Sequence, residues 1–173
     1  MHDHFLWCQE KYTMSRLRSI PVNYVVIPCI SILIMIFGKW YASHASLWYI
    51  TLKIPPIVPS KNMMALVWHV ISILTTAAVL GIWNRAERTM RFWIIMVLFC
   101  LNAILNASWS YLFFYQHALG FAALDTCMIA TTAITIVVLL WPLSRIVTIL
   151  LLPYALWSAY ATVVMIALWM LNK

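Results

Sequence analysis

The chain has 173 residues, of which 65% are hydrophobic and 9% are charged, whereas a soluble domain carries about 25% charged residues. This composition excludes an ordinary soluble fold, because too few polar residues remain to cover its surface, and it predicts an all-α integral membrane protein. The net charge is +7, but the basic residues outside the apolar runs form no stripe interleaved with aromatic residues. We therefore expect the basic residues to lie at the surface of a lipid bilayer, and we expect no nucleic acid as partner.

Apolar runs divide the chain into a short polar beginning and one transmembrane domain. Residues 1–19 are polar and of mixed charge, and we expect them to be retained as an N-terminal segment. A helix needs about 20 apolar residues to cross a bilayer, so residues 20–173 predict a bundle of five transmembrane helices. The expected spans are 20–38, 63–84, 92–115, 118–141 and 146–171.

The longest connection, residues 39–62, contains Pro55, Pro56 and Pro59. Proline lacks an amide donor and clashes with the preceding carbonyl in a helix, so this stretch predicts an ordered loop over one end of the bundle. The connection between spans three and four, Gln116–His117, is very short and predicts that these two spans are antiparallel neighbours.

The distribution of positive charge predicts the orientation in the membrane. One end of the bundle collects seven basic residues: Lys11, Arg16, Arg18, Arg85, Arg88, Arg91 and Arg145. The other end collects four: Lys39, Lys53, Lys61 and Lys173. The positive-inside rule therefore places the N-terminus on the cytoplasmic side and the proline loop outside.

Several polar and aromatic residues lie well inside the expected spans. Asp125 is the only acidic residue there, and a lone charge in hydrocarbon is costly, so it should face the bundle interior or a wet end. Its role is open between contacting a ligand and fixing helix packing. Asn102 and Asn106 share a face of span three and favour interhelical hydrogen bonding. Trp109 and Trp157 either pack in the core or line a pocket for a flat apolar ligand.

Other chemistry-bearing residue types show no strong pattern. The four cysteines form no CxxC pair, and they predict neither a disulfide framework nor a zinc site. His69 and His117 are the only candidates for haem-type axial ligands, although a lone histidine is more often structural. We expect no metal ligands, no catalytic residue and no required cofactor.

A set of motifs in one register resembles the TspO/MBR family, the tryptophan-rich sensory and translocator proteins. Residues 105–114 read LNASWSYLFF and are similar to the family's LNxxWSxLFF signature, and Asp125 follows at the position of its ALxD motif. Pro153 to Trp157 resemble PYLxW, followed by Ala161, and Val67-Trp68 match a VW pair. The matches extend from about residue 47 to residue 172.

This resemblance implies a five-helix bundle, commonly a homodimer, that binds tetrapyrroles such as protoporphyrin IX or haem, sterols and drug-like ligands. The implied pocket lies inside the bundle and is closed by the loop over residues 39–62, a candidate lid. The ligand-binding residues implied by the matched positions are Asn106, Trp109, Phe121, Asp125, Trp157, Ala161, Trp68 and Ile57.

The chain departs from the family pattern mainly in this loop. The usual KPxWxPP motif reads here from Ile54 to Ser60, and its tryptophan is replaced by Ile57. A further family tryptophan is Phe121 here. We therefore expect a divergent member with an altered ligand preference.

Three functions follow from these patterns. The first is a membrane receptor or carrier for a flat hydrophobic ligand, with a sensory or transport-regulating role. The alternatives are an enzyme that degrades porphyrin in light and a membrane scaffold that binds no ligand. The bacterial inner membrane is the expected location, with the outer mitochondrial membrane as the alternative.

Overall fold

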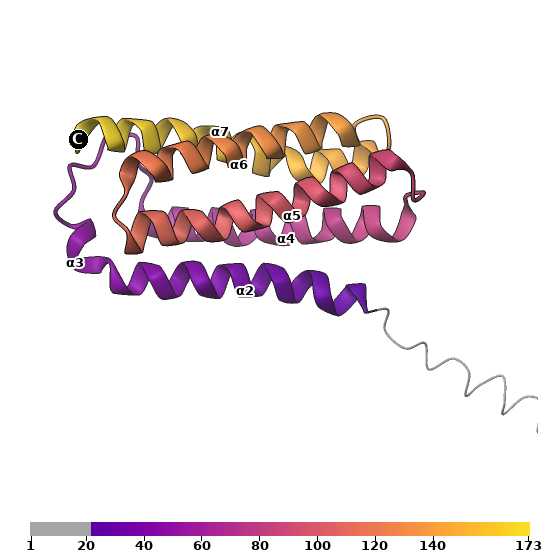
Figure 1. Cartoon of the computed structure of the whole chain (residues 1–173), viewed down its shortest axis with the longest axis horizontal. Coiled ribbons are helices and arrows are strands. Elements are labelled where there is room, and N and C mark those ends of the chain that lie inside the picture. Colours follow the sequence, from indigo (N-terminus) through magenta and orange to yellow (C-terminus); the bar gives the residue numbers. More distant parts are fainter. Residues whose placement is uncertain (1–21) are drawn as a thin grey trace, which may run out of the picture.

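A computed structural model describes residues 22–173, and all regular secondary structure in this range is helical. Five helices are long and apolar enough to cross a membrane, and they lie side by side along one axis (Figure 1). They are α2 (Asn23–His44), α4 (Lys61–Arg85), α5 (Met90–Ser110) with its π-helical continuation η1 (Tyr111–Tyr115), α6 (Leu119–Leu140) and α7 (Arg145–Leu171). The expected all-α membrane bundle is confirmed, while the polar segment 1–19 lies outside the described residues.

Hydroxyl side chains mark the start of three of these helices. Ser60, Thr89 and Ser144 each accept a hydrogen bond from the backbone N–H three residues later, at the beginning of α4, α5 and α7. Such an N-cap satisfies one of the N–H groups that have no partner within the helix. The short connections between spans can therefore end and restart helices at defined positions.

The first span is longer than the sequence predicted, and the lid is correspondingly shorter. The expected end of that span was residue 38, but α2 continues to His44. Residues 39–44 contain no proline, and the long side chain of Lys39 can carry its charge to the membrane surface without ending the helix. The connection to α4 therefore begins at Ala45 and contains the short helix α3 (Ser46–Tyr49) before the proline loop.

The core lies between α4, α5, α6 and α7. One buried cluster includes Phe92, Ile95, Ile136 and Leu140 and fills the end of the bundle where α4 connects to α5. A second, smaller cluster around Phe113 and residues of α6 and α7 fills the opposite end. The space for a functional site lies where these two clusters meet.

Helix α2 contributes no buried residue to this core. The Tyr41 ring of α2 packs edge-on against Tyr111 and Tyr115 of η1. Polar contacts join α2 to α4: Asn23 Nδ2 donates to Asn84 Oδ1 at 2.8 Å, and the hydroxyls of Ser31 and Thr76 lie 2.8 Å apart. Lipid is as apolar as a leucine side chain, so hydrophobicity gives little drive for two helices to associate in a membrane. Side-chain hydrogen bonds are the attachment that this environment favours for α2.

The close packing of α6 predicts that a larger side chain on its buried face lowers the stability of the bundle. Ala133 of α6 is 2% exposed, so we expect Ala133→Leu to overpack the core and to lower the free energy of unfolding by about 1–3 kcal/mol. Thermal unfolding followed by circular dichroism in detergent measures the effect. Ala65→Leu on α4 is the matched control, because Ala65 is exposed and has room for the larger side chain. Equal losses of stability in the two variants would contradict this packing.

Candidate functional site

A small cavity of about 60 Å³ lies inside the bundle between α4, α5, α6 and α7. Its walls combine aromatic rings with a few small polar groups and carry no charged side chain. The lining residues are Met64, Trp68, Asn106, Trp109, Thr126, Ile129, Trp157, Ser158, Tyr160, Ala161, Val164 and Met165. The apolar walls with few polar groups are typical of small-molecule sites.

The structure brings together most of the residues that the sequence singled out. Trp68, Asn106, Trp109, Trp157 and Ala161 come from three different helices, and all of them line this cavity. Their convergence depends on the register of α4 and α7 against α5, which no single motif contains.

Phe121 and Ile57 do not reach the cavity. Phe121 is 68% exposed on α6, because the neighbouring Ala122 and Ala123 occupy the buried face of that helix and turn Phe121 outward. Ile57 is 44% exposed in the loop. The structure therefore places these two expected ligand residues on the surface.

Asp125 is buried beside the cavity without lining it. The residue is 6% exposed, and its Oδ1 accepts a hydrogen bond from Ser108 Oγ at 3.1 Å. Its Oδ2 has no hydrogen-bond partner among the described residues. The contact with Ser108 joins α5 to α6, which is the packing role, while a contact between Asp125 and a ligand stays a prediction.

Two indole donors at the cavity are also without partners. Trp109 Nε1 and Trp157 Nε1 are buried, and neither meets an acceptor within residues 22–173. A buried donor without a partner costs about 1–3 kcal/mol, and most such groups in folded proteins are satisfied. A bound molecule with carbonyl or carboxylate oxygens could accept both hydrogen bonds.

Polar side chains beneath the cavity form one network across three helices. Tyr154 Oη donates to Asn102 Oδ1 at 2.5 Å and accepts from Asn106 Nδ2 at 2.8 Å. Asn102 Nδ2 donates to Thr132 Oγ1 at 2.7 Å and to the Ile129 carbonyl at 3.1 Å. The interhelical role expected for the two asparagines is confirmed, and it connects α5 to both α6 and α7.

Sequence reasoning missed Tyr154 as the third member of this network. The signal was present, because a tyrosine in the middle of an apolar span needs a partner for its hydroxyl. Its position was read only as part of a motif. Thr126 and Ser158 were also missed, and small hydroxyl residues in a span carry little signal because they can bond to their own helix.

The two histidines considered as haem ligands lie away from the cavity. His69 is exposed on α4, and its Nδ1 lies 2.5 Å from the carbonyl oxygen of Ala65 in the same helix. His117, in the short connection between α5 and α6, stacks on Trp48 with ring centroids 4.0 Å apart. Neither position brings an imidazole to the cavity, so the structure lends no support to axial ligation there.

The loop over the cavity is tied to α7 at two places. The backbone N–H of Lys53 donates to Asn172 Oδ1 at 2.8 Å, and Asn172 Nδ2 donates to the Lys53 carbonyl at 2.9 Å. Further along, Tyr160 Oη donates to the carbonyl of Ile57. Pro55, between these ties, is buried. The segment from Lys53 to Ile57 therefore closes this end of the bundle.

Helix α3 adds aromatic packing to the same end. Trp48 and Tyr49 contact Phe113 edge-on, with ring centroids 5.4 Å and 6.3 Å away. Burial raises the pKa of the Tyr49 hydroxyl above its ordinary value. The Lys61 ammonium lies 5.6 Å from the Tyr49 ring centroid and makes a cation–π contact with it.

Comparisons with known proteins agree with the motifs and the fold. The model of the TspO/MBR family matches residues 24–170. The chain is 35% identical over 117 residues to an uncharacterized membrane protein, YtaB, of Bacillus subtilis, which covers 66% of this chain and 74% of the relative. It is 32% identical over 139 residues to the tryptophan-rich protein TspO of Bacillus cereus. This match covers 77% of this chain and 89% of the relative. Protein CrtK of Rhodobacter capsulatus is 25% identical to this chain over 131 residues. This match covers 72% of this chain and 78% of the relative.

The polar network predicts a loss of stability when its central hydroxyl is removed. Tyr154→Phe removes the 2.5 Å hydrogen bond to Asn102 Oδ1, which keeps only the longer one from Asn106 Nδ2 at 3.1 Å, and should lower the free energy of unfolding by about 0.5–2 kcal/mol. Tyr24→Phe on α2 is the control, because Tyr24 is 48% exposed and has no hydrogen bond of its hydroxyl among the described residues. Chemical unfolding in detergent compares the two variants. A Tyr154→Phe protein as stable as the control would show that the network contributes nothing.

The ties between loop and α7 predict a local effect on backbone dynamics. Asn172→Ala removes both hydrogen bonds to Lys53, so peptides covering residues 50–57 should exchange their amide hydrogens roughly ten-fold faster. Hydrogen exchange with mass spectrometry in nanodiscs measures this rate. Lys173→Ala changes the neighbouring residue without touching the loop and should leave it unchanged. Unchanged exchange in Asn172→Ala would mean that the loop is held by its other contacts alone.

Proposed function

This chain belongs to the TspO/MBR family, and on that premise we propose that it is a membrane receptor for a flat hydrophobic ligand, bound inside the bundle at the cavity between α4, α5, α6 and α7. A tetrapyrrole such as protoporphyrin IX is the ligand class that we propose first. The binding has a sensory or transport-regulating role in this proposal.

The observation that carries the proposal is the pair of indole donors at the cavity wall. Trp109 and Trp157 present flat apolar faces, on which a planar ring system can stack. Their N–H groups meet no acceptor among the described residues, and Asn106 adds a side-chain amide to the same wall. A tetrapyrrole offers both a flat macrocycle and carboxylate oxygens, so it can satisfy the faces and the donors together.

The cavity is smaller than this ligand. A volume of about 60 Å³ has room for a few water molecules, whereas ligand pockets usually measure about 300–1,000 Å³. Binding therefore requires a wall of the cavity to move. The proposal includes such a rearrangement of side chains within the existing bundle.

Three parts of this proposal rest on the family resemblance and on charge rather than on the cavity. They are the homodimer, the bacterial inner membrane as location, and the cytoplasmic N-terminus. The excess of basic residues at one end of the bundle comes from Lys11, Arg16 and Arg18. The remaining Arg and Lys residues are divided equally between the two ends.

A titration with protoporphyrin IX tests the proposed function. Trp157→Phe removes one unpaired donor and part of the stacking surface, so the dissociation constant should rise roughly ten-fold. The Soret absorbance of the porphyrin is the readout, since it does not depend on protein fluorescence. Trp141→Phe is the matched control, because Trp141 is 52% exposed at the end of α6 and should bind as the wild type does.

The same titration can reject the proposal. If the wild-type protein shows no saturable change in the Soret band, the receptor function is wrong. If Trp157→Phe and Trp141→Phe bind with equal affinity, the cavity at Trp157 is not the binding site.

A further inference from the structure

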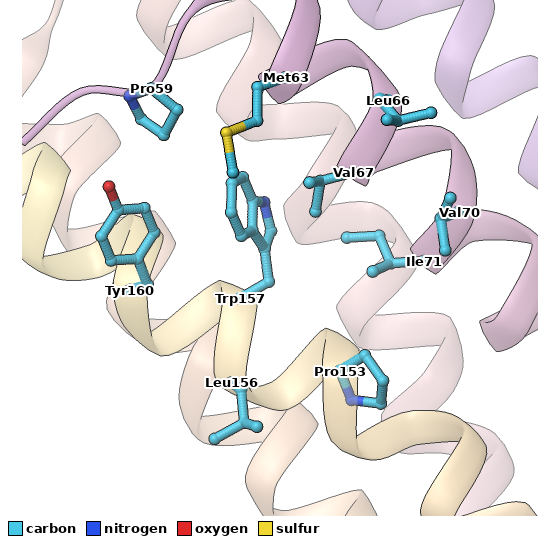
Figure 2. Close-up of a pocket in the computed structure, with 10 residues that line it drawn as sticks. All are labelled: Pro59, Met63, Leu66, Val67, Val70, Ile71, Pro153, Leu156, Trp157 and Tyr160. Atoms are coloured by element: carbon cyan, nitrogen blue, oxygen red, sulfur yellow. The ribbon is translucent and has the colours of Figure 1, made fainter.

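A groove of about 550 Å³ opens on the lipid-facing side of the bundle, between α4 and α7 (Figure 2). Met63, Leu66 and Val70 line it from α4, and Pro153, Leu156 and Tyr160 line it from α7. Leu66 is 65% exposed and Leu156 is 70% exposed, so the groove faces the acyl chains of the bilayer. Its size is within the usual range for ligand sites, and its lining is almost wholly apolar.

This groove and the interior cavity share part of their walls. Trp157 and its neighbour Tyr160 line both spaces. Figure 2 shows the Trp157 indole rising from α7 towards Met63, with Val67 and Ile71 of α4 on its other side. The large outer space and the small inner one are therefore adjacent, and the indole forms part of the wall between them.

The Trp157 indole is held in this wall by packing, against the buried core cluster and against the Tyr160 ring 5.4 Å away. Its Nε1 has no hydrogen-bond partner among the described residues, so a change of rotamer breaks no such bond. The Tyr160 hydroxyl, in contrast, donates to the loop carbonyl of Ile57 and is held in place. Pro153, one turn before Trp157, lacks an N–H and leaves this part of α7 with one backbone hydrogen bond fewer.

The alternative route, from water through the end of the bundle, is closed. Asn172 and Tyr160 hold the loop against α7 at Lys53 and Ile57, and Trp48 packs on Phe113 beside it. Opening this end would break three hydrogen bonds to α7, whereas rotation of Trp157 breaks none. A hydrophobic ligand is also far more concentrated in the bilayer than in water, because burial of its apolar surface drives it there.

We propose that the groove between α4 and α7 is the route by which a flat hydrophobic ligand, dissolved in the bilayer, reaches the interior cavity, and that the Trp157 indole is the gate. The ligand first lies in the groove against Leu66 and Val70. Rotation of the indole then joins the groove to the cavity and lets the ligand pass. This inference rests on the proposed function, since it concerns the path to the same site.

Filling the groove tests the route without touching the cavity. Leu66→Trp places a bulky ring in the groove, and Leu66 does not line the cavity. The matched control is Ile73→Trp on the same helix, which is 68% exposed and lines neither space. Val70→Trp, a second groove variant, covers the case in which the first is poorly folded. Helix content from circular dichroism checks the fold of all three.

The measurement is the rate of exchange of protoporphyrin IX between phosphatidylcholine vesicles and the protein in proteoliposomes. Soret absorbance in a stopped-flow instrument gives the association rate, and an excess of empty vesicles gives the dissociation rate. We expect Leu66→Trp to slow both rates roughly ten-fold relative to Ile73→Trp, with an unchanged dissociation constant, because a blocked route changes the barrier and not the bound state.

Each other outcome overturns the inference in a distinguishable way. If the wild type binds saturably but the groove variants exchange ligand as fast as Ile73→Trp, the lateral route is wrong and the proposed function stands. If the groove variants weaken equilibrium binding, the groove is part of the binding site and not a route to it. If the wild type shows no saturable binding, the proposed function and the route are both wrong.

Discussion

The hydrogen bonds among Asn102, Asn106 and Tyr154 are the interaction on which the middle of this bundle depends. In lipid, helices gain little from burying apolar surface against one another, and a polar group without a partner is costly. One hydroxyl and two amides, at 2.5 Å and 2.8 Å, satisfy each other and connect α5 to α7, while Asn102 also reaches α6. This network sets the register in which Trp109 and Trp157 meet at one cavity.

The cavity above this network is distinguished by two buried indole donors as well as by its shape. The polar groups of the network are paired, whereas the two indole N–H groups at the cavity wall meet no acceptor in the described part of the chain. Polar groups in a membrane bundle are expected to find partners within the protein. Donors left free beside flat aromatic faces are therefore the physical basis for proposing a planar ligand with acceptor oxygens.

The two ends of the site differ in how firmly they are closed. The loop end is held to α7 by side-chain and backbone hydrogen bonds, although the family tryptophan of this loop is replaced by Ile57. On the side facing lipid, the wall includes the Trp157 indole, which no hydrogen bond from residues 22–173 holds. Access to the cavity is thus a question of side-chain rotation rather than of loop opening.

The amino-acid sequence alone predicts the membrane class, the number of spans and the family, because hydropathy, proline positions and motif spacing are local properties of the chain. It also identified Trp68, Asn106, Trp109, Trp157 and Ala161, which do meet at one cavity. The tertiary structure decided the rest. It placed Phe121 on the surface, paired Tyr154 with the asparagines and brought Trp157 into the walls of both cavity and groove. Each of these depends on how one helix is rotated against its neighbours, and hydrophobicity gives no signal for that rotation in spans whose residues are apolar on every face.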